Sequence, residues 1–158
     1  MPTLADDLKQ VPLFSSFSQR QLKRLSRDFR ERSLVAGTTP VRQGHMSGIG
    51  FFVIIEGEAS VSIDGREVAR LGPGDHFGEF ALIGSRPPTA TVTAETPLLR
   101  CAELASWHFR QFVKENPGVS WKLLEHLVDV LVEERSAEEP PHRQGSGAAA
   151  GRSSARSA

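Results

Sequence analysis

The sequence predicts a mainly β domain with helices at both ends. Near the N-terminus, Leu22, Leu25 and Phe29 recur at i, i+3 and i+7, the spacing of one helix face. Between residues 33 and 104, about eight short apolar segments follow one another at intervals of 8–12 residues, which favours a sandwich or barrel of short strands. Helical patterns return after residue 105.

The N-terminal helical lead is expected to cover residues 1–32. Ser18 stands directly before the apolar helical pattern, where a serine side chain can cap the free N–H groups of a first turn. The preceding segment VPLFSSF, residues 11–17, is expected to pack on the same core.

The strand region, residues 33–104, is divided by turn signals. GFFVIIEG, residues 50–57, is nearly all apolar and predicts a strand buried on both faces. Residues 58–78 predict a hairpin around Asp64-Gly65, a strong two-residue turn signal. Short strands and turns are also expected in SLVAGTTPVRQG, residues 33–44, and two more strands in TATVTAETPLLRCAEL.

Residues 105–135 predict two helices. The first is capped by Ser106 and stopped by Asn116-Pro117. The second, residues 119–135, carries an apolar stripe that could pair two chains or cover its own; the stripe is Leu124, Leu127, Val128 and Leu131. Residues 136–158 consist mainly of Ala, Gly, Ser, Pro and Arg, a composition typical of a disordered tail.

Composition excludes several classes of function. Lys and Arg together number 19, as do Asp and Glu, so the chain has no overall basic field for nucleic acid or membranes. A single cysteine excludes an internal disulfide framework. We see no signal peptide and no apolar run of about 18 residues, so we expect a cytoplasmic protein. No nucleophile–base set is recognisable, so we expect neither an enzyme nor a cofactor.

The segment FGEFALIGSRPPTATV, residues 77–92, has the chemistry of an anion site. Gly78 allows close approach of the backbone, and a helix starting there would present free N–H groups to a phosphate. Glu79 would repel that phosphate but could accept hydrogen bonds from a sugar hydroxyl. A sugar phosphate is therefore a reasonable ligand from chemistry alone.

The same segment resembles the phosphate-binding cassette of the cyclic nucleotide-binding domain family, whose pattern is F-G-E-x-A-L-x-x-x-x-P-R-[TS]-A-[TS]-V. The similarity covers about residues 10–135, because the helical lead, the turn GTTPVRQG and the hairpin also fit in order. It implies a jelly-roll-like β-roll with flanking helices. Helix 119–135 would be a lid, as in regulators of the catabolite-activator type, but without their DNA-binding helix-turn-helix.

The resemblance also implies a binding site for cAMP or cGMP inside the roll. Gly78 and the amides of Ala81 and Leu82 would face the cyclic phosphate, and Glu79 would accept the ribose 2′-hydroxyl. Val61 and Val68 would line the pocket for ribose and base. The expected ligand-binding set also includes Phe77, Phe80, Arg86, Thr89 and Ala90.

The sequence departs from the family pattern at Pro88, where the phosphate-binding arginine should stand. Proline has neither a charge nor an N–H group. A charge-assisted hydrogen bond contributes about 1.5–3 kcal/mol, so its loss weakens binding by roughly ten- to a hundredfold. Arg86 either takes over this contact or is a solvated loop residue. The chain is accordingly a nucleotide sensor with weakened binding, or a degenerate fold that serves protein interaction without nucleotide.

The other expectations concern partners, metals and packing. A partner protein or a second copy could bind helix 119–135, whereas direct DNA binding and membrane binding are not expected. His76 could bind a metal only with further ligands, which His45, His108, His126 and His142 do not provide in the sequence pattern, so no metal site is expected. Trp107 and Trp121 are interpreted as packing residues, and Cys101 as a buried, inert thiol.

Overall fold

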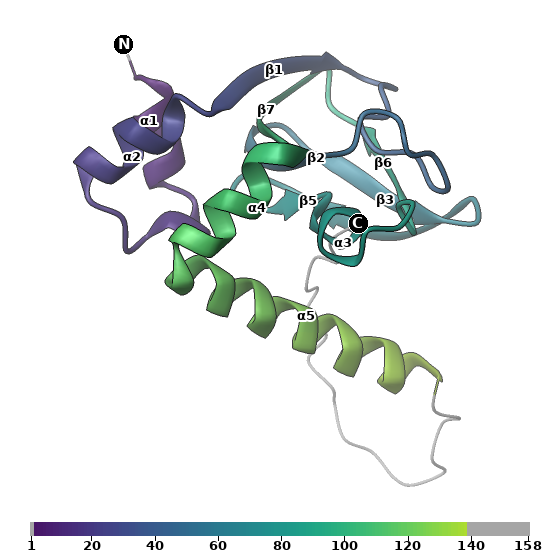
Figure 1. The fold of residues 1–158 in the computed structure, drawn as a ribbon. Coiled ribbons are helices and arrows are strands. Elements are labelled where there is room, and N and C mark those ends of the chain that lie inside the picture. Colours follow the sequence, from purple (N-terminus) through teal and green to yellow (C-terminus); the bar gives the residue numbers. More distant parts are fainter. Residues whose placement is uncertain (1, 139–158) are drawn as a thin grey trace, which may run out of the picture.

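Two antiparallel sheets form the centre of the computed structural model, which describes residues 2–138 (Figure 1). The larger sheet has the strand order β1 (Phe29–Val35), β7 (Leu98–Ala105), β2 (Gly50–Glu56) and β5 (His76–Phe77). The smaller has the order β4 (Arg66–Leu71), β3 (Ala59–Ile63) and β6 (Thr91–Ala94). The predicted mainly β fold with flanking helices is confirmed, and the sheets form a β-roll.

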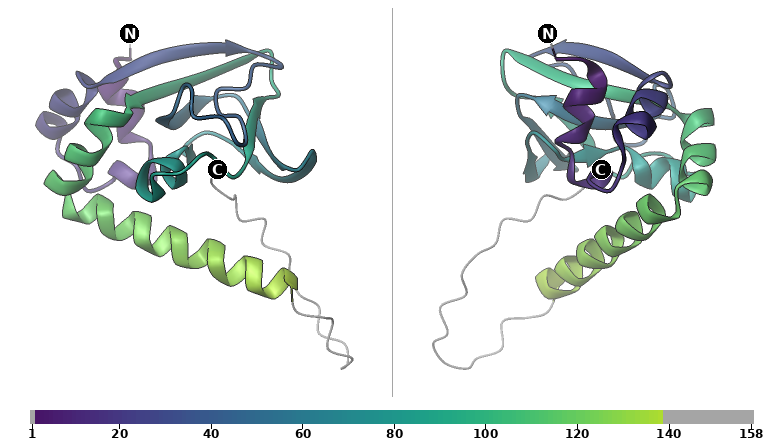
Figure 2. Two further views of the ribbon diagram at one scale, coloured as in Figure 1. Left: turned by 45° about the vertical axis from the view of Figure 1, so that its right-hand side comes forward. Right: turned by 90° about the vertical axis from the view of Figure 1, so that its left-hand side faces the viewer.

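Helices flank the roll in sequence order. The N-terminal group is α1 (Leu4–Lys9), the 3₁₀ helix η1 (Pro12–Phe14) and α2 (Gln19–Ser26). Between β5 and β6 lies α3 (Glu79–Gly84), and after β7 follow α4 (Ser106–Glu115) and α5 (Pro117–Glu138). The views in Figure 2 show α5 as a long rod that passes below the roll and diverges from it toward its C-terminal end. Within residues 2–138, no helix combines the length and apolarity that crossing a bilayer requires.

The larger sheet separates two hydrophobic cores, because successive side chains of a strand point to opposite faces. In β2, Phe51 and Val53 join the core under the helices, whereas Phe52 and Ile54 join the core inside the roll. β7 alternates in the same way between its two faces. This two-sided burial explains the continuous apolar run that predicted the strand.

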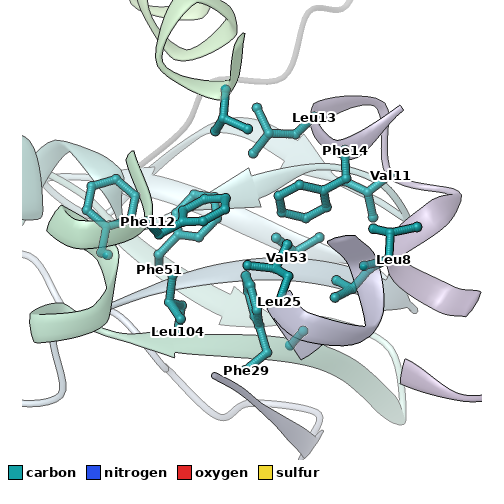
Figure 3. Packing of buried hydrophobic residues seen from close by; sticks show 14 of the residues in the cluster. Leu8, Val11, Leu13, Phe14, Leu25, Phe29, Phe51, Val53, Leu104 and Phe112 are labelled. Carbon is teal, nitrogen blue, oxygen red and sulfur yellow. The ribbon is translucent and has the colours of Figure 1, made fainter. Parts of the chain in front are cut away.

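The core under the helices holds three mutually packed rings, of which Phe14 comes from η1, Phe29 from β1 and Phe112 from α4 (Figure 3). Their centroids lie 6.0–6.4 Å apart in edge-to-face geometry. Such pairs add stabilisation beyond the area they bury. The rings thus connect the N-terminal helices, the sheet and the C-terminal helices.

Cys101 lies on the face of β7 that joins the core inside the roll. Burial raises the pKa of its thiol to about 12, although the charge of Arg32 acts in the opposite direction. At neutral pH the thiol is therefore protonated and inert, as expected.

Several local predictions are confirmed. Ser18 caps α2 through a capping box with Gln21. Asp64 and Gly65 both have positive φ, of 52° and 80°, as a tight hairpin turn between β3 and β4 requires. Helix α4 ends at Glu115, as the stop signal Asn116-Pro117 predicts, whereas α5 begins at Pro117, two residues before the predicted start, because the fixed φ of proline suits a first helical position.

Some strand predictions were wrong. Phe29 belongs to β1 rather than to the helix before it, because pairing with Leu104 satisfies its backbone while its ring still enters the core. The structure describes seven strands, and residues 36–49 form loops with a single bridge, Val41 to Val92. The glycines and proline in that loop interrupt strand pairing.

The helix predictions also need correction. Ser106 is the first residue of α4, and its N-cap is Ala105, without a side-chain hydrogen bond. Helix α5 continues to Glu138, three residues into the segment predicted as a tail; residues 139–158 lie outside the described part. Trp107 and Trp121 are 74% and 64% exposed, so they are not packing residues.

Gly57 yields a test of the sheet packing. It has φ of +92°, and an added Cβ would lie 2.3 Å from the Leu98 carbonyl oxygen. Gly57→Ala should therefore lower the free energy of unfolding by roughly 3 kcal/mol or more. Urea denaturation followed by tryptophan fluorescence measures this.

Gly37→Ala is the matched control, since Gly37 has a similar φ of +88° but open space around its Cβ position. It should cost only the roughly 1–2 kcal/mol of the left-handed backbone. Equal losses in the two variants would show that the contact with β7 is not tight.

Candidate functional site

The cassette begins where β5 ends. Gly78 is the N-cap of α3 and has φ of +97°, a conformation that favours glycine. An added Cβ would lie 2.0 Å from the carbonyl oxygen of Gly50. The close approach that Gly78 permits is therefore to β2, and not, as expected, to a ligand.

Four of the predicted site residues come together inside the roll. Val61, Phe77 and Ala90 are buried members of one hydrophobic cluster, and Val68 packs against it. Val61 belongs to β3, Phe77 to β5 and Val68 to β4, whereas Ala90 lies in the loop before β6. This apolar wall has the composition that suits the carbon face of a base or a ribose.

The remaining cassette residues lie elsewhere. The side chains of Ala81 and Leu82 line a groove between α3 and α4 that also contains Trp107. Leu82 packs against the core under the helices, so its side chain points away from the roll interior. Phe80 is half-buried and Thr89 is exposed.

Pro88 and Arg86 differ in their environments. Pro88 is buried, and its carbonyl oxygen accepts a hydrogen bond of 2.9 Å from the amide of Gly44. Arg86 is exposed, and its side chain folds back over Gly84, with Nε 3.2 Å from the position of an added Cβ there. In this conformation Arg86 does not occupy the place of the missing arginine.

Glu79 is fully buried and faces two histidines. Its Oε2 lies 3.3 Å from Nδ1 of His76, and its Oε1 lies 3.8 Å from Nε2 of His126. The two imidazole rings are 4.9 Å apart, centroid to centroid. Glu79 therefore joins the cassette to α5, and the expectation that His126 provides no further ligand beside His76 is wrong.

Sequence reasoning missed His126 because it selected the wrong face of α5. The predicted stripe is largely exposed, with Leu124 at 54% and Val128 and Leu131 at 57% each. The buried residues are Val119, Leu123 and Val130, and His126 falls on their face at helical spacing. A second apolar face with a histidine in its middle was the signal that could have found it.

The environment shifts the pKa values of the two histidines in opposite directions. Burial lowers the pKa of His76, but the charge and close contact of Glu79, with a further contribution from Asp75, outweigh burial and raise it above 6.5. Burial and the neighbouring His76 lower the pKa of His126, and the charges of Glu79, Asp129 and Asp75 do not compensate. His76 and His126 together therefore bind a first proton more readily than a second.

The cluster also has the chemistry of a metal site. His76, Glu79 and His126 each offer one ligand atom, and these atoms all lie within 4.8 Å of one another. Two imidazoles and a carboxylate are a common ligand set for zinc. A pocket beside the cluster is lined by His76, His126, Asp75 and Lys122 among others, so the site borders solvent on one side.

Comparisons with known proteins give a consistent result. The model of the family described as "Cyclic nucleotide-binding domain" matches residues 31–116. A cAMP-dependent protein kinase regulatory subunit of Yarrowia lipolytica is 37% identical over 93 residues, which are 58% of this chain and 24% of that protein. A cyclic nucleotide-gated potassium channel of Mesorhizobium japonicum is 36% identical over 110 residues, or 70% of this chain and 30% of the channel. The chain thus spans less than a third of these relatives.

A solved structure shares the fold. The catabolite activator protein of Thermus thermophilus superimposes with a TM-score of 0.70 at 23% identity, over 80% of this chain and 61% of that one. The resemblance predicted from the cassette is confirmed.

The Glu79 cluster makes stability depend on pH. Because the pKa of His76 is raised on folding, its contribution is present below about pH 6.5 and is lost as pH rises through the raised value. Glu79 also favours the charged form of His126. Glu79→Gln should therefore lower the free energy of unfolding by roughly 1–3 kcal/mol near pH 5.5 and by less, or not at all, near pH 8.5.

Urea denaturation at the two pH values, in buffer with EDTA, measures this difference. Glu125→Gln, an exposed change one residue before His126, is the control and should have little effect at either pH. A loss for Glu79→Gln that is equal at both pH values, or larger at the higher pH, would contradict the assignment.

Proposed function

Because the chain belongs to the cyclic nucleotide-binding domain family, we propose that it is a regulatory module that binds cAMP or cGMP inside its β-roll, with affinity lowered at Pro88. The observation that carries this proposal is the apolar wall of Val61, Val68, Phe77 and Ala90 beside the cassette. In this proposal the module has no catalytic activity of its own and lies in the cytoplasm.

The lowered affinity follows from the loss of one charged donor. Pro88 offers the phosphate no hydrogen bond, and Arg86 is turned toward Gly84. Amides of the cassette remain available as donors, because a phosphate can be held by backbone N–H groups alone. The nucleotide is therefore held mainly by its base and ribose and by the cassette backbone.

Ribose binding would involve α5 directly. To accept the 2′-hydroxyl of a nucleotide inside the roll, the carboxylate of Glu79 has to leave His76 and His126 and turn toward the roll interior. Since His126 belongs to α5, the exchange releases one tie between the cassette and that helix. Nucleotide would thus shift the population between two positions of α5, which is the output of the module.

Pro88 also supports a second function, in which the fold binds a protein without any nucleotide. The burial of Pro88 and the outward position of Arg86 favour this alternative. The two functions differ in whether a nucleotide binds at all, and calorimetry separates them.

Restoring the arginine tests the proposal. In calorimetric titrations, Pro88→Arg should bind cAMP and cGMP roughly ten- to a hundredfold more tightly than the unmodified protein, since one charge-assisted hydrogen bond is regained. Adenosine, which has no phosphate, should bind both proteins equally.

Pro87→Arg is the matched control, because it adds the same charge one residue earlier at an exposed position, and it should leave affinity unchanged. Arg86→Ala should also leave affinity unchanged. If neither the unmodified protein nor Pro88→Arg gives heat at millimolar nucleotide, the module does not bind cyclic nucleotides and the protein-binding function stands.

The exposed face of α5 points to a second copy of the chain as partner. Trp121, Leu124, Val128, Leu131 and Val132 are each more than half exposed on one helix, which is typical of an interaction surface. Two such helices can pair about a twofold axis with the same patch on both sides. We propose that the dimer contact lies on this face.

Light scattering tests the dimer. The unmodified protein should show twice the monomer mass, and Val128→Glu should show the monomer mass, because a charge would be buried at the centre of the contact. Glu134→Gln, an exposed polar change on the same helix, should remain dimeric. A monomer for the unmodified protein at all concentrations would leave the face to a different protein.

A further inference from the structure

We propose that His76, Glu79 and His126 form a binding site for a divalent transition metal ion of the zinc type, which fastens α5 to the cassette. The three residues come from β5, α3 and α5, so a single ion would bridge elements that are 50 residues apart in sequence between positions 76 and 126.

The distances fit such an ion. Ligand atoms about 2.0–2.1 Å from a tetrahedral zinc lie about 3.3 Å from one another. The contact between Oε2 of Glu79 and Nδ1 of His76 already measures 3.3 Å. The contact between Oε1 of Glu79 and Nε2 of His126 measures 3.8 Å, and one ligand atom from each of the three residues lies within 4.8 Å of the other two. Side-chain adjustments of up to about 1.5 Å would complete the tetrahedral geometry.

Burial gives an independent reason. Glu79 is 0% exposed, and the contacts of its carboxylate with His76 and His126 are ion pairs only when those imidazoles carry a proton. A buried carboxylate is costly unless it is paired or coordinates a metal. A divalent cation between the three side chains would compensate the carboxylate charge even when both imidazoles are neutral.

The ligand types select the kind of ion. Calcium and magnesium prefer sites made of oxygen ligands, whereas two imidazoles with one carboxylate suit zinc and similar ions. The protein supplies three ligands, and the adjoining pocket lined by Asp75 and Lys122 leaves room for a water as the fourth. The nearby carboxylate of Asp75 adds negative charge and is itself held by a 2.8 Å hydrogen bond from the Gly72 amide.

Sheet pairing and side-chain packing hold the proposed ligand His76 in place. His76 pairs with Val53 across the sheet, and its ring packs 5.5 Å from that of Phe51. The turn before it is fixed by backbone hydrogen bonds between Ile54 and the residues Gly74 and Asp75. A site whose ligands are held by packing and sheet pairing needs little reorganisation to bind its ion.

A metal here would oppose nucleotide binding, an extension that rests on the proposed function. An ion coordinated by Glu79 keeps that carboxylate away from the ribose and holds α5 against the cassette. Metal and cyclic nucleotide would then each lower the affinity for the other by the same factor.

The test is calorimetric titration of the full chain, freed of metal with EDTA, with Zn²⁺ alone. We expect one equivalent to bind tightly, and His76→Gln and His126→Gln each to weaken this binding by at least about tenfold. Co²⁺ should give the visible absorption of a tetrahedral site, which both variants lose. His45→Gln, which removes an exposed histidine, is the control and should bind as the unmodified protein does.

Binding that is absent, or equally strong in His126→Gln, overturns the metal site. Since His126 is only partly buried and lies in a regular helix, this variant should keep the fold, which circular dichroism verifies. In a second titration, saturating Zn²⁺ should lower the cAMP affinity of the unmodified protein but not that of His126→Gln. Zn²⁺ binding without any cAMP binding would refute the proposed function and leave the metal site standing; the reverse result would refute only the metal site.

Discussion

The structure depends on one constraint, that the larger sheet must be apolar on both faces. β2 and β7 separate the core inside the roll from the core under the helices, and neither core can form without them. Side-chain alternation then decides which residue serves which core. It also fixes the cassette, since β5 pairs with β2 and brings His76 against Phe51 on the helix side of the sheet while Phe77 faces the roll.

The adjacent residues His76 and Phe77 therefore face opposite sides of the sheet. Phe77 closes the apolar interior where a nucleotide is proposed to bind, whereas Glu79 lies under α5 with the two histidines. Nucleotide and metal both need this one carboxylate. In both proposals the position of α5 therefore depends on the buried carboxylate of Glu79. The signal of the module would be the change of its partner between the histidines, a metal ion and the ribose.

Much of the fold could be predicted from the sequence, because local signals agree with the tertiary structure. The turn at Asp64-Gly65, the N-cap Ser18 and the nearly all-apolar β2 each have one favourable conformation. Phe29 could not be assigned in this way, since a helix and a strand both bring its ring into the core and only the distant β7 decides. Trp107 and Trp121 were misjudged because large apolar side chains usually become buried, whereas here they remain on the surface.

The site was predictable only in part. The family pattern located the cassette and the apolar wall, both of which depend on residues close in sequence or on regular strand alternation. The contact between Glu79 and His126 depends on how α5 rotates about its own axis, and two competing apolar faces left that rotation open. Packing settled it in favour of the narrower face with Val119, Leu123 and Val130.

The shielded thiol of Cys101 has a practical consequence for following α5. The sequence holds no other cysteine, and this one is buried with a pKa raised to about 12. A cysteine introduced on the outer side of α5 would therefore be the single site that a maleimide reagent reaches in the folded protein. Fluorescent or spin labels can thus be attached to the helix without altering the native interior, so that its displacement can be followed in real time.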